Sequence, residues 1–298
     1  MLKIDMHAIK VFEVCPRDGL QNIKEFISTD QKIRLVNMLT DAGCRAIEVT
    51  GFVHPKWVPQ MADAASVLQE ITKAPGVVYN ALIPNIKGLE RAIDSGLKEV
   101  VTIMSASEAH NKKNLNMSVA DSLIQMREIN ASARERGIMV RSYIATSFGC
   151  PMQGSIAPEL VAEIAVELER FGSYEISLGD TTGMSDPFLS YKVVKAVKSK
   201  LSKSNLAVHF HRSGGIEFAN ILASMQAGAD VIDSAVGGLG GCPYAPGAKG
   251  NIATELLVEM LDRMGIETGI DLAKIKMAAE FAKSLDPYTS CTEETCNE

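Results

Sequence analysis

The sequence lacks the marks of several large classes of protein. No CxxC pair occurs among its 6 cysteines, and 6 cysteines in 298 residues are too few for a disulfide scaffold. No apolar run reaches the roughly 18 residues of a membrane span, and the first residues, MLKIDMHAIK, lack the order of a signal peptide. Basic residues number 30 against 36 acidic ones, so nothing favours nucleic acid or an anionic membrane. We expect a soluble, reduced, cytoplasmic protein.

A glycine-containing unit recurs along the chain. Each copy has an amphipathic stretch, a glycine, two or three spacer residues and a β-branched run. The copies are DAGCRAIEVT (41–50), DSGLKEVVTI (94–103), RERGIMVRSYI (134–144), ERFGSYEISL (169–178) and QAGADVIDSA (226–235). Glycine accepts the positive φ that ends a helix, so each unit predicts a helix followed by a buried parallel strand.

Three further β-type runs, at 10–14, 77–82 and 206–210, bring the expected strands to eight. Helical segments follow them at about 28–42, 61–72, 85–95, 118–136, 158–171, 187–200, 214–227 and 252–264. This alternation predicts an α/β protein with a single (β/α)8 TIM barrel. A doubly wound open sheet is the alternative, because connectivity alone does not show closure. We expect the barrel to form a catalytic domain over 1–266, and 267–298 to hold one added C-terminal helix (271–284) and a polar tail.

Unusual polar residues fall where a barrel has its active site, at the carboxyl ends of the strands and in the loops that follow. They are Arg17 and Asp18 after the first strand, Glu48 in the second, Asp180 at the end of the sixth, His209 and His211 in the seventh, and the glycine-rich loop 237–251 after the eighth.

The strongest metal signal is the pair His209 and His211. Residues two apart on a strand point to the same face, and Asp18 and Asp180 are expected at the same end. The alternative is a pair of hydrogen-bonded histidines without a metal. Nitrogen and oxygen donors suit Mg²⁺ or Mn²⁺, and imidazole also admits Zn²⁺ or Co²⁺. The pattern favours a divalent metal centre.

Arg17, Glu48 and Cys242 are candidates for the chemistry beside such a centre. Arg17 and Asp18 either clamp the barrel mouth as a salt bridge, or Asp18 binds the metal while Arg17 holds an oxyanion. Glu48 lies in an apolar run, where an unpaired carboxylate is costly to bury, so it pairs with Arg17, contacts substrate, or does both. Cys242 is either an inert core residue or a thiol that the glycine-rich loop brings near a ligand.

Several segments spread along the chain match one known pattern. They are EVCPRDGLQN (13–22), EVTGFVHPKWVPQMAD (48–63), SASEAHNKKNLN (105–116), FGCP (148–151), EISLGDTTG (175–183), HFH (209–211) and GGLGGCPYAPGAKGNIATE (237–255). Together they resemble the 3-hydroxy-3-methylglutaryl-CoA (HMG-CoA) lyase family, a group of metal-dependent barrel enzymes related to isopropylmalate and homocitrate synthases. The resemblance runs in order from about residue 9 to 270 and implies a pyruvate carboxyltransferase/lyase-type TIM barrel.

The resemblance implies a metal ligand set of Asp18, His209, His211 and Asn251. Asn251 is the member of this set that the strand pattern alone does not indicate.

Further roles follow from the resemblance. Arg17 would contact the thioester oxygen, Cys242 would be the acid or base of the loop, and Glu48 and Asp180 would line the substrate site. Two more matches are positively charged positions near the mouth that could serve substrate or CoA: Lys24 and Arg141.

The reaction implied is a retro-Claisen type cleavage of HMG-CoA to acetoacetate and acetyl-CoA, with an acyl-CoA thioester as substrate and no redox or nucleotide cofactor. Arg17 would stabilise the enolate oxygen, Cys242 would protonate carbon, and His209 or Asp18 would be the base. The family also suggests a homodimer.

The sequence departs from the family pattern at Gly51, where a serine is usual, at Arg212, where an aspartate is usual, and at Cys15, which replaces a glycine and which we interpret as packing. The first two motivate a related substrate, such as citramalyl-CoA or a longer-chain 3-hydroxyglutaryl-CoA. Arg212 also motivates an alternative of another class, a metal-free, catalytically silent barrel that acts as a binding protein.

Overall fold

The computed structural model describes residues 8–240 and 250–286. Eight parallel strands form a closed barrel in the order β1 to β8. They are β1 (Lys10–Glu13), β2 (Ala46–Gly51), β3 (Val78–Leu82), β4 (Glu99–Ser105), β5 (Met139–Ala145), β6 (Glu175–Asp180), β7 (Asn205–Phe210) and β8 (Val231–Ser234). Pairing of β1 with β8 closes the sheet, so the prediction of a barrel is confirmed and the open sheet is wrong.

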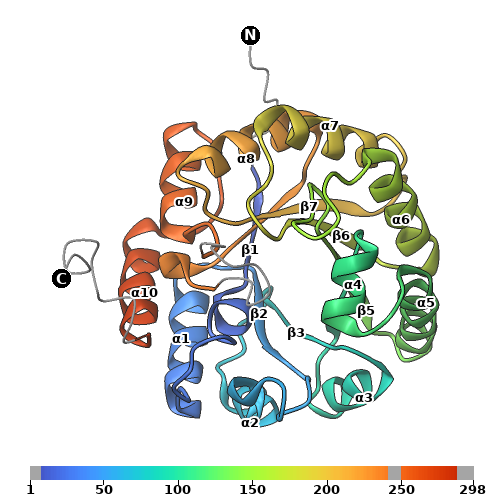
Figure 1. Cartoon of the computed structure of the whole chain (residues 1–298). Helices are drawn as coiled ribbons and strands as arrows, with labels where there is room; N and C mark the ends of the chain where they lie inside the picture. Colours follow the sequence, from blue (N-terminus) through green and yellow to red (C-terminus); the bar gives the residue numbers. More distant parts are fainter. Residues whose placement is uncertain (1–7, 241–249, 287–298) are drawn as a thin grey trace, which may run out of the picture.

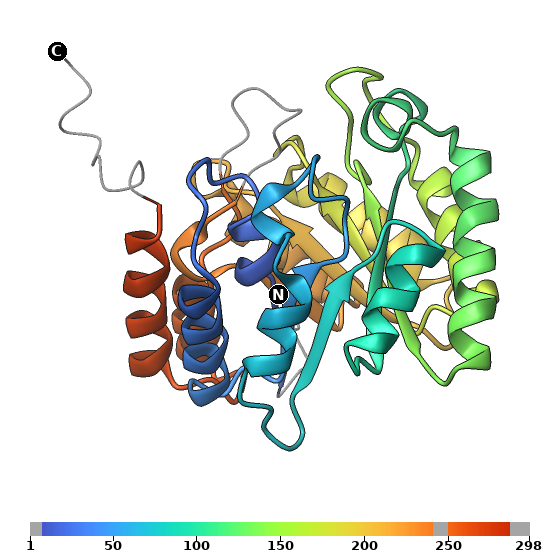
Figure 2. The same cartoon turned by 90° about the horizontal axis from the view of Figure 1, so that it is seen from below.

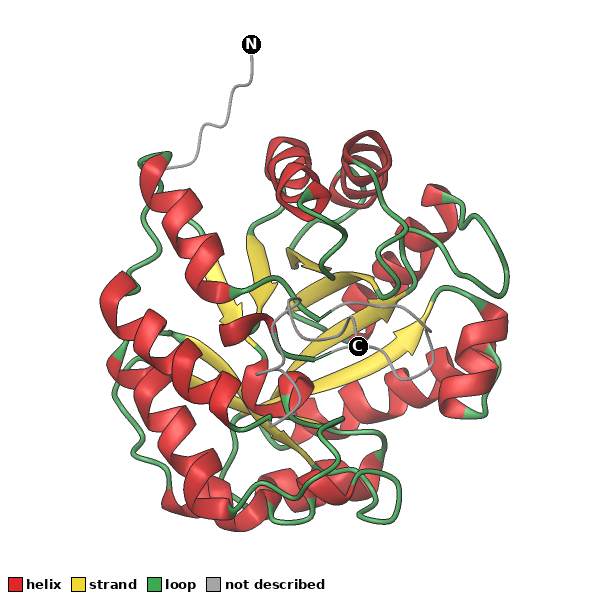
Figure 3. Ribbon diagram, turned by 60° about the vertical axis from the view of Figure 1, so that its left-hand side comes forward, coloured by secondary structure: helices red, strands yellow, loops and turns green. Residues whose placement is uncertain are grey.

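A ring of helices surrounds the strands (Figures 1 and 3). The helices are α1 (Thr29–Asp41), α2 (Ala64–Glu70), α3 (Ile86–Asp94), α4 (Glu108–Leu115), α5 (Val119–Glu135), α6 (Pro158–Phe171), α7 (Pro187–Lys198), α8 (Ile216–Ala227), α9 (Thr254–Arg263) and α10 (Leu272–Ser284). The added C-terminal helix is α10, which packs beside α1 and α9 (Figure 1). The division of the chain at residue 267 stays a prediction.

The glycines of the recurring unit do end helices. Gly43, Gly96, Gly137, Gly172 and Gly228 all have positive φ. At Gly43 space is limiting as well, because a Cβ built there would lie 2.5 Å from the carbonyl oxygen of Gly269. Such a position admits glycine only.

Short elements at the carboxyl ends of several strands were not predicted, and two of them follow β1 and β4. A single π-helical turn, η1 (Cys15–Gly19), directly follows β1 and carries Arg17 and Asp18. Helix α4 follows β4 and lies inside the outer ring of helices (Figure 1). Seen from the side, the strands point to the upper edge of the molecule, where these connections gather (Figure 2).

Charged side chains cross the interior of the barrel. Arg141 on β5 donates to Glu175 on β6 and to Asp233 on β8, each at 2.6 Å, and Lys10 on β1 reaches the other oxygen of Glu175 at 3.0 Å. Because buried charges are stable only when paired, this network ties four strands together.

Candidate metal centre

Asp18, His209 and His211 converge at the carboxyl end of the barrel. One ligand-type atom from each lies within 4.8 Å of the others. The two Nε2 atoms of the histidines are 3.3 Å apart, and Nε2 of His209 is 4.0 Å from Oδ2 of Asp18. His209 lies in β7, His211 directly follows the last residue of that strand, and Asp18 lies in the turn η1. The HxH spacing and the position after β1 predict this convergence.

Asn251 completes the group. An antiparallel backbone bridge holds it beside His211. Its side-chain nitrogen donates to Oδ2 of Asp18 at 2.7 Å and to the carbonyl of Leu239 at 3.0 Å. Its Oδ1 atom is buried without a hydrogen-bond partner among the described residues.

These four side chains fit a divalent cation. The orphaned amide oxygen of Asn251, one carboxylate and two imidazoles form a nitrogen and oxygen donor set without thiolate, which suits Mg²⁺ or Mn²⁺ and admits Zn²⁺ or Co²⁺. An unsatisfied buried acceptor is costly, and a cation beside it would remove that cost.

Arg17 lies between Asp18 and Glu48. Its Nη1 donates to Asp18 at 2.6 Å, while Nε and Nη2 donate to the two oxygens of Glu48 at 2.7 and 3.1 Å. The Tyr143 hydroxyl donates to Glu48 at 2.9 Å. Glu48 therefore forms the predicted pair with Arg17, and the salt bridge between Arg17 and Asp18 is present as well.

The charges at this site hold Asp18 ionised. Burial alone would raise the pKa of Asp18, but the charges of Arg17, His209 and His211 outweigh it and lower the pKa from 3.8 to about 2. Burial likewise opposes the charge of Arg17, yet the carboxylates of Glu48 and Asp18 raise the pKa of the guanidinium. The carboxylate is thus ready to bind a cation near neutral pH.

Asp180 lies at the end of β6 and binds the loop that follows. Its two oxygens accept from the backbone nitrogens of Met184 at 2.9 Å and Ser185 at 3.1 Å. Burial raises its pKa from 3.8 to about 6 despite these bonds. Contact with substrate at Asp180 stays a prediction.

The two positively charged candidates lie in different places. Lys24 is exposed on the loop between η1 and α1, at the carboxyl end of the barrel. Arg141 is fully buried inside the barrel, with its guanidinium bound to Glu175 and Asp233. The expectation that Arg141 lies near the mouth is wrong, because its position early in β5 places the side chain within the barrel.

Three more residues that the sequence analysis singled out are Cys242, Gly51 and Arg212. Cys242 lies outside the described residues. Gly51 lies beside Arg17, since a Cβ built on it would be 3.8 Å from Cγ of Arg17. Arg212 is exposed, whereas His209, His211 and Asn251 are buried.

Sequence reasoning missed Tyr143 and Asp233. Asp233 accepts from the His209 ring at 3.3 Å through Oδ2. The signal that identifies Glu48, a carboxylate within an apolar strand, was also present for Asp233 in the run DVIDSA. Tyr143 carries no such signal, because a tyrosine in a strand is common.

Residues 8–282 match a family model described as HMGL-like. The chain belongs to this family. It is 50% identical over 273 residues to the mitochondrial hydroxymethylglutaryl-CoA lyase of Bos taurus, which covers 92% of this chain and 84% of the relative. The resemblance seen in the sequence motifs is therefore confirmed.

Solved structures agree with this membership. The crystal structure of hydroxymethylglutaryl-CoA lyase from Pseudomonas aeruginosa has a TM-score of 0.92 and 44% identity, and the match covers 95% of this chain and 94% of that one. An HMG-CoA lyase from Acinetobacter baumannii, solved in complex with coenzyme A and 3-methylmalate, has a TM-score of 0.89 and 39% identity, with coverage of 94% and 91%.

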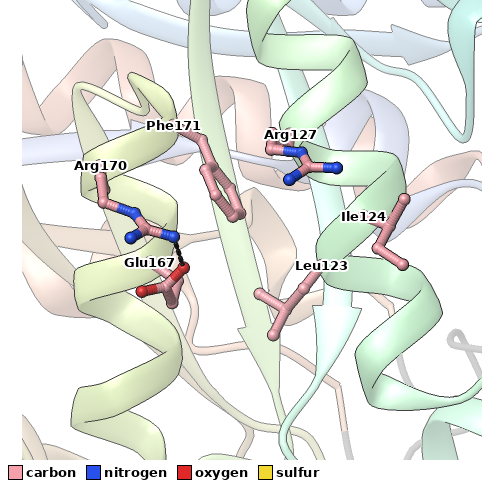
Figure 4. A pocket seen from close by; sticks show the side chains of 6 residues that line it. All are labelled: Leu123, Ile124, Arg127, Glu167, Arg170 and Phe171. Carbon is pink, nitrogen blue, oxygen red and sulfur yellow. Dashed lines mark hydrogen bonds and ion pairs between the residues drawn. The ribbon is translucent and has the colours of Figure 1, made fainter.

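A hollow between α5 and α6 lies apart from this centre (Figure 4). Its lining comes from the two helices: Leu123, Ile124, Arg127, Glu167, Arg170 and Phe171. It belongs to the outer ring of helices, whereas the candidate metal ligands Asp18, His209 and His211 lie at the carboxyl end of the barrel. In the described part of the chain no helix is both long and apolar enough to cross a membrane.

Proposed function

We propose that this chain is a divalent-metal-dependent carbon–carbon lyase that cleaves HMG-CoA to acetoacetate and acetyl-CoA. The observation that carries the proposal is the convergence of Asp18, His209 and His211 next to Arg17. Membership of the HMGL-like family and the names of the relatives support the same activity.

Asp18, His209, His211 and Asn251 would hold the cation, for which Mg²⁺ and Mn²⁺ are the first candidates. When bound, a divalent cation supplies positive charge that acidifies the hydroxyl group at C3 of the substrate and fixes its orientation. Asn251 would contribute its free Oδ1 atom. A base, proposed to be His209 or Asp18, would take the proton of this hydroxyl group as the C2–C3 bond breaks, so that C3 becomes a ketone and the enolate of acetyl-CoA departs.

Arg17 is proposed to stabilise the enolate oxygen of the departing thioester. A guanidinium has five N–H donors, and three of them are used by Glu48 and Asp18 among the contacts of the described residues. One N–H on each of Nη1 and Nη2 remains for a substrate oxygen. Planar donors that are fixed before the reaction stabilise developing charge without reorganisation.

Glu48 and Tyr143 give Arg17 its fixed orientation. Both oxygens of Glu48 are engaged, one with Nε of Arg17 and the other with Nη2 and the Tyr143 hydroxyl. We therefore infer that Glu48 acts on the substrate through Arg17.

Two assignments rest on the family resemblance. Cys242 would protonate the carbon of the acetyl-CoA enolate, and Lys24 would bind the CoA portion near the barrel mouth. Coenzyme A in the structure of the Acinetobacter baumannii relative supports a CoA thioester as the substrate class.

The test is an assay of thioester cleavage against metal content. Purified protein is stripped with EDTA and assayed with HMG-CoA before and after addition of Mg²⁺ or Mn²⁺. We expect acetoacetate and acetyl-CoA in equal amounts only when metal is present. Protein that binds Mn²⁺ but cleaves no thioester would contradict the proposal, and protein that binds no metal would favour the silent barrel.

A related substrate is the second candidate, and Gly51 is the observation that favours it. The Cβ that Gly51 lacks would stand next to Arg17, so a serine there would add a hydroxyl group close to the proposed thioester site. The same assay with citramalyl-CoA and a longer-chain 3-hydroxyglutaryl-CoA decides the substrate. If Gly51→Ser raises kcat/KM for HMG-CoA and lowers it for a rival thioester, the rival is the natural substrate.

A homodimer and a cytoplasmic location are proposed on the resemblance and the composition. Sedimentation equilibrium should give twice the mass of 32.1 kDa, and a monomer at micromolar concentration would contradict the dimer. The bovine relative is named as a mitochondrial form, so cell fractionation is the test of location.

A further inference from the structure

Asp233 lies directly behind the candidate ligand His209. The two residues face each other across neighbouring strands β7 and β8. Oδ2 of Asp233 is 3.3 Å from Nδ1 of His209, while Nε2 on the other side of the ring faces His211 and Asp18. The ring is therefore held between a carboxylate on one side and the candidate metal site on the other.

This contact selects one tautomer of the neutral imidazole. A carboxylate can only accept, so Nδ1 must carry the hydrogen and donate it to Asp233. Nε2 then presents its lone pair to the metal site. In metal sites an outer carboxylate that holds a ligating histidine in this way also raises its basicity.

Asp233 is itself fixed by two further partners. Oδ1 accepts from Nη2 of Arg141 at 2.6 Å, and Oδ2 accepts from the Ser177 hydroxyl at 2.9 Å. Asp233 is almost completely buried, and Arg141 is held in turn by Glu175. The position of the carboxylate is thus defined by β5 and β6 as well as by its own strand.

We propose that Asp233 is a positioning residue for the metal ligand His209, and that Arg141 acts through Asp233 and makes no contact with substrate. The inference rests on the proposed metal-dependent function. It assigns to Asp233 the orientation of one imidazole, and to Arg141 a role in the barrel interior in place of one at the mouth.

The first test measures Mn²⁺ affinity of the full-length protein by electron paramagnetic resonance, without substrate. Asp233→Asn should weaken Mn²⁺ binding roughly 10- to 100-fold. Glu99→Gln is the matched control, because Glu99 is a buried carboxylate at the opposite end of the barrel that accepts from Asn80 at 2.8 Å. The control should keep the affinity of the unsubstituted protein. Equal Mn²⁺ dissociation constants for Asp233→Asn and the unsubstituted protein would overturn the proposal.

The second test needs no substitution and so holds even if Asp233→Asn fails to fold. Nitrogen-15 NMR of the His209 ring in metal-free protein is followed upward in pH until the ring is neutral. We expect the hydrogen to stay on Nδ1, and a neutral ring protonated on Nε2 would refute the tautomer.

These outcomes are separable from the fate of the lyase activity. Mn²⁺ binding that depends on Asp233 in a protein that cleaves no thioester would support the positioning role and reject the activity. If the protein cleaves the thioester but Asp233→Asn leaves Mn²⁺ affinity unchanged, the lyase activity is supported and the positioning role of Asp233 is rejected.

Discussion

At the scale of single residues, Arg17 is the side chain whose surroundings determine the proposed chemistry. Its three hydrogen bonds to Glu48 and Asp18 leave it charged, buried and unable to rotate. Breaking a buried ion pair exposes the remaining partner to the full cost of its desolvation. The site therefore uses the same contacts for stability and for orientation.

Arg17→Lys should lower kcat for thioester cleavage by about 100-fold or more, because an ammonium cannot bind Glu48 with two parallel bonds and still offer donors to an oxyanion. KM should change little, since the lost interaction forms mainly in the transition state. Steady-state kinetics at saturating Mn²⁺ measure both. A kcat within threefold of the unsubstituted value would remove Arg17 from the mechanism.

Glu13 should make the stability of the protein depend on pH. Its Oε1 accepts from the backbone nitrogens of Cys15 and Val236, its Oε2 accepts from Thr254, and burial raises its pKa from 4.5 to about 7 against these bonds. The folded state holds the proton more tightly than the unfolded state. The contribution to stability is therefore complete below pH 4.5 and is lost as pH rises to about 7.

Glu13→Gln removes this ionisation while keeping an acceptor for the two backbone nitrogens. Relative to the unsubstituted protein, its free energy of unfolding should rise by about 3 kcal/mol between pH 4.5 and pH 8. Urea unfolding at several pH values measures the difference, with Glu128→Gln on the exposed face of α5 as control. If the difference in free energy of unfolding between the two proteins does not vary with pH, folding does not raise the pKa of Glu13.

At the scale of elements, periodicity predicted the strands and most helices, and it failed where polar residues form the element. The segment of α4, EAHNKKNL, has no apolar stripe. The one indication of a helix is the capping residue Ser107, which directly precedes it. The sequence likewise does not predict the turn η1, because the proline in Cys15–Gly19 is typical of a loop. Site residues on strands were predictable from alternation, whereas the contact of Arg141 on β5 with Asp233 on β8 depends on closure of the sheet.

The helix-ending glycines allow a test at this scale. Gly43 and Gly96 both have positive φ, but only Gly43 has a neighbouring backbone atom where a Cβ would stand. Gly96→Ala should lower the free energy of unfolding by about 1 kcal/mol through backbone strain alone, and Gly43→Ala by about 3 kcal/mol through strain and overpacking. Urea denaturation compares the two. Equal losses of free energy of unfolding in the two variants would mean that the loop at Gly269 moves away from the new Cβ without an energetic penalty.

At the scale of the whole molecule, closure of the barrel is what makes the site. Asp18 and Asn251 are 233 residues apart in sequence, yet their side chains are joined by a 2.7 Å hydrogen bond. The chain reaches this arrangement because β1 and β8 are neighbours in the closed sheet. The resemblance to a family supplied Asn251 before the geometry did, since an asparagine in a glycine-rich loop carries no signal of its own.

Metal binding should stabilise the whole barrel. Mn²⁺ at about 100 times its dissociation constant adds roughly 3 kcal/mol to the free energy of unfolding, so Tm of EDTA-treated protein should rise by about 5 °C. Differential scanning calorimetry measures the shift. Asp18→Ala should show none, and an equal rise in that variant would place the ion elsewhere on the molecule.

The most direct measurement is anomalous X-ray scattering at the manganese edge from crystals grown with Mn²⁺. We expect one strong peak in contact with Asp18, His209, His211 and the Oδ1 atom of Asn251. Crystals in which these four side chains surround no peak, at Mn²⁺ concentrations that saturate the protein in solution, would contradict it.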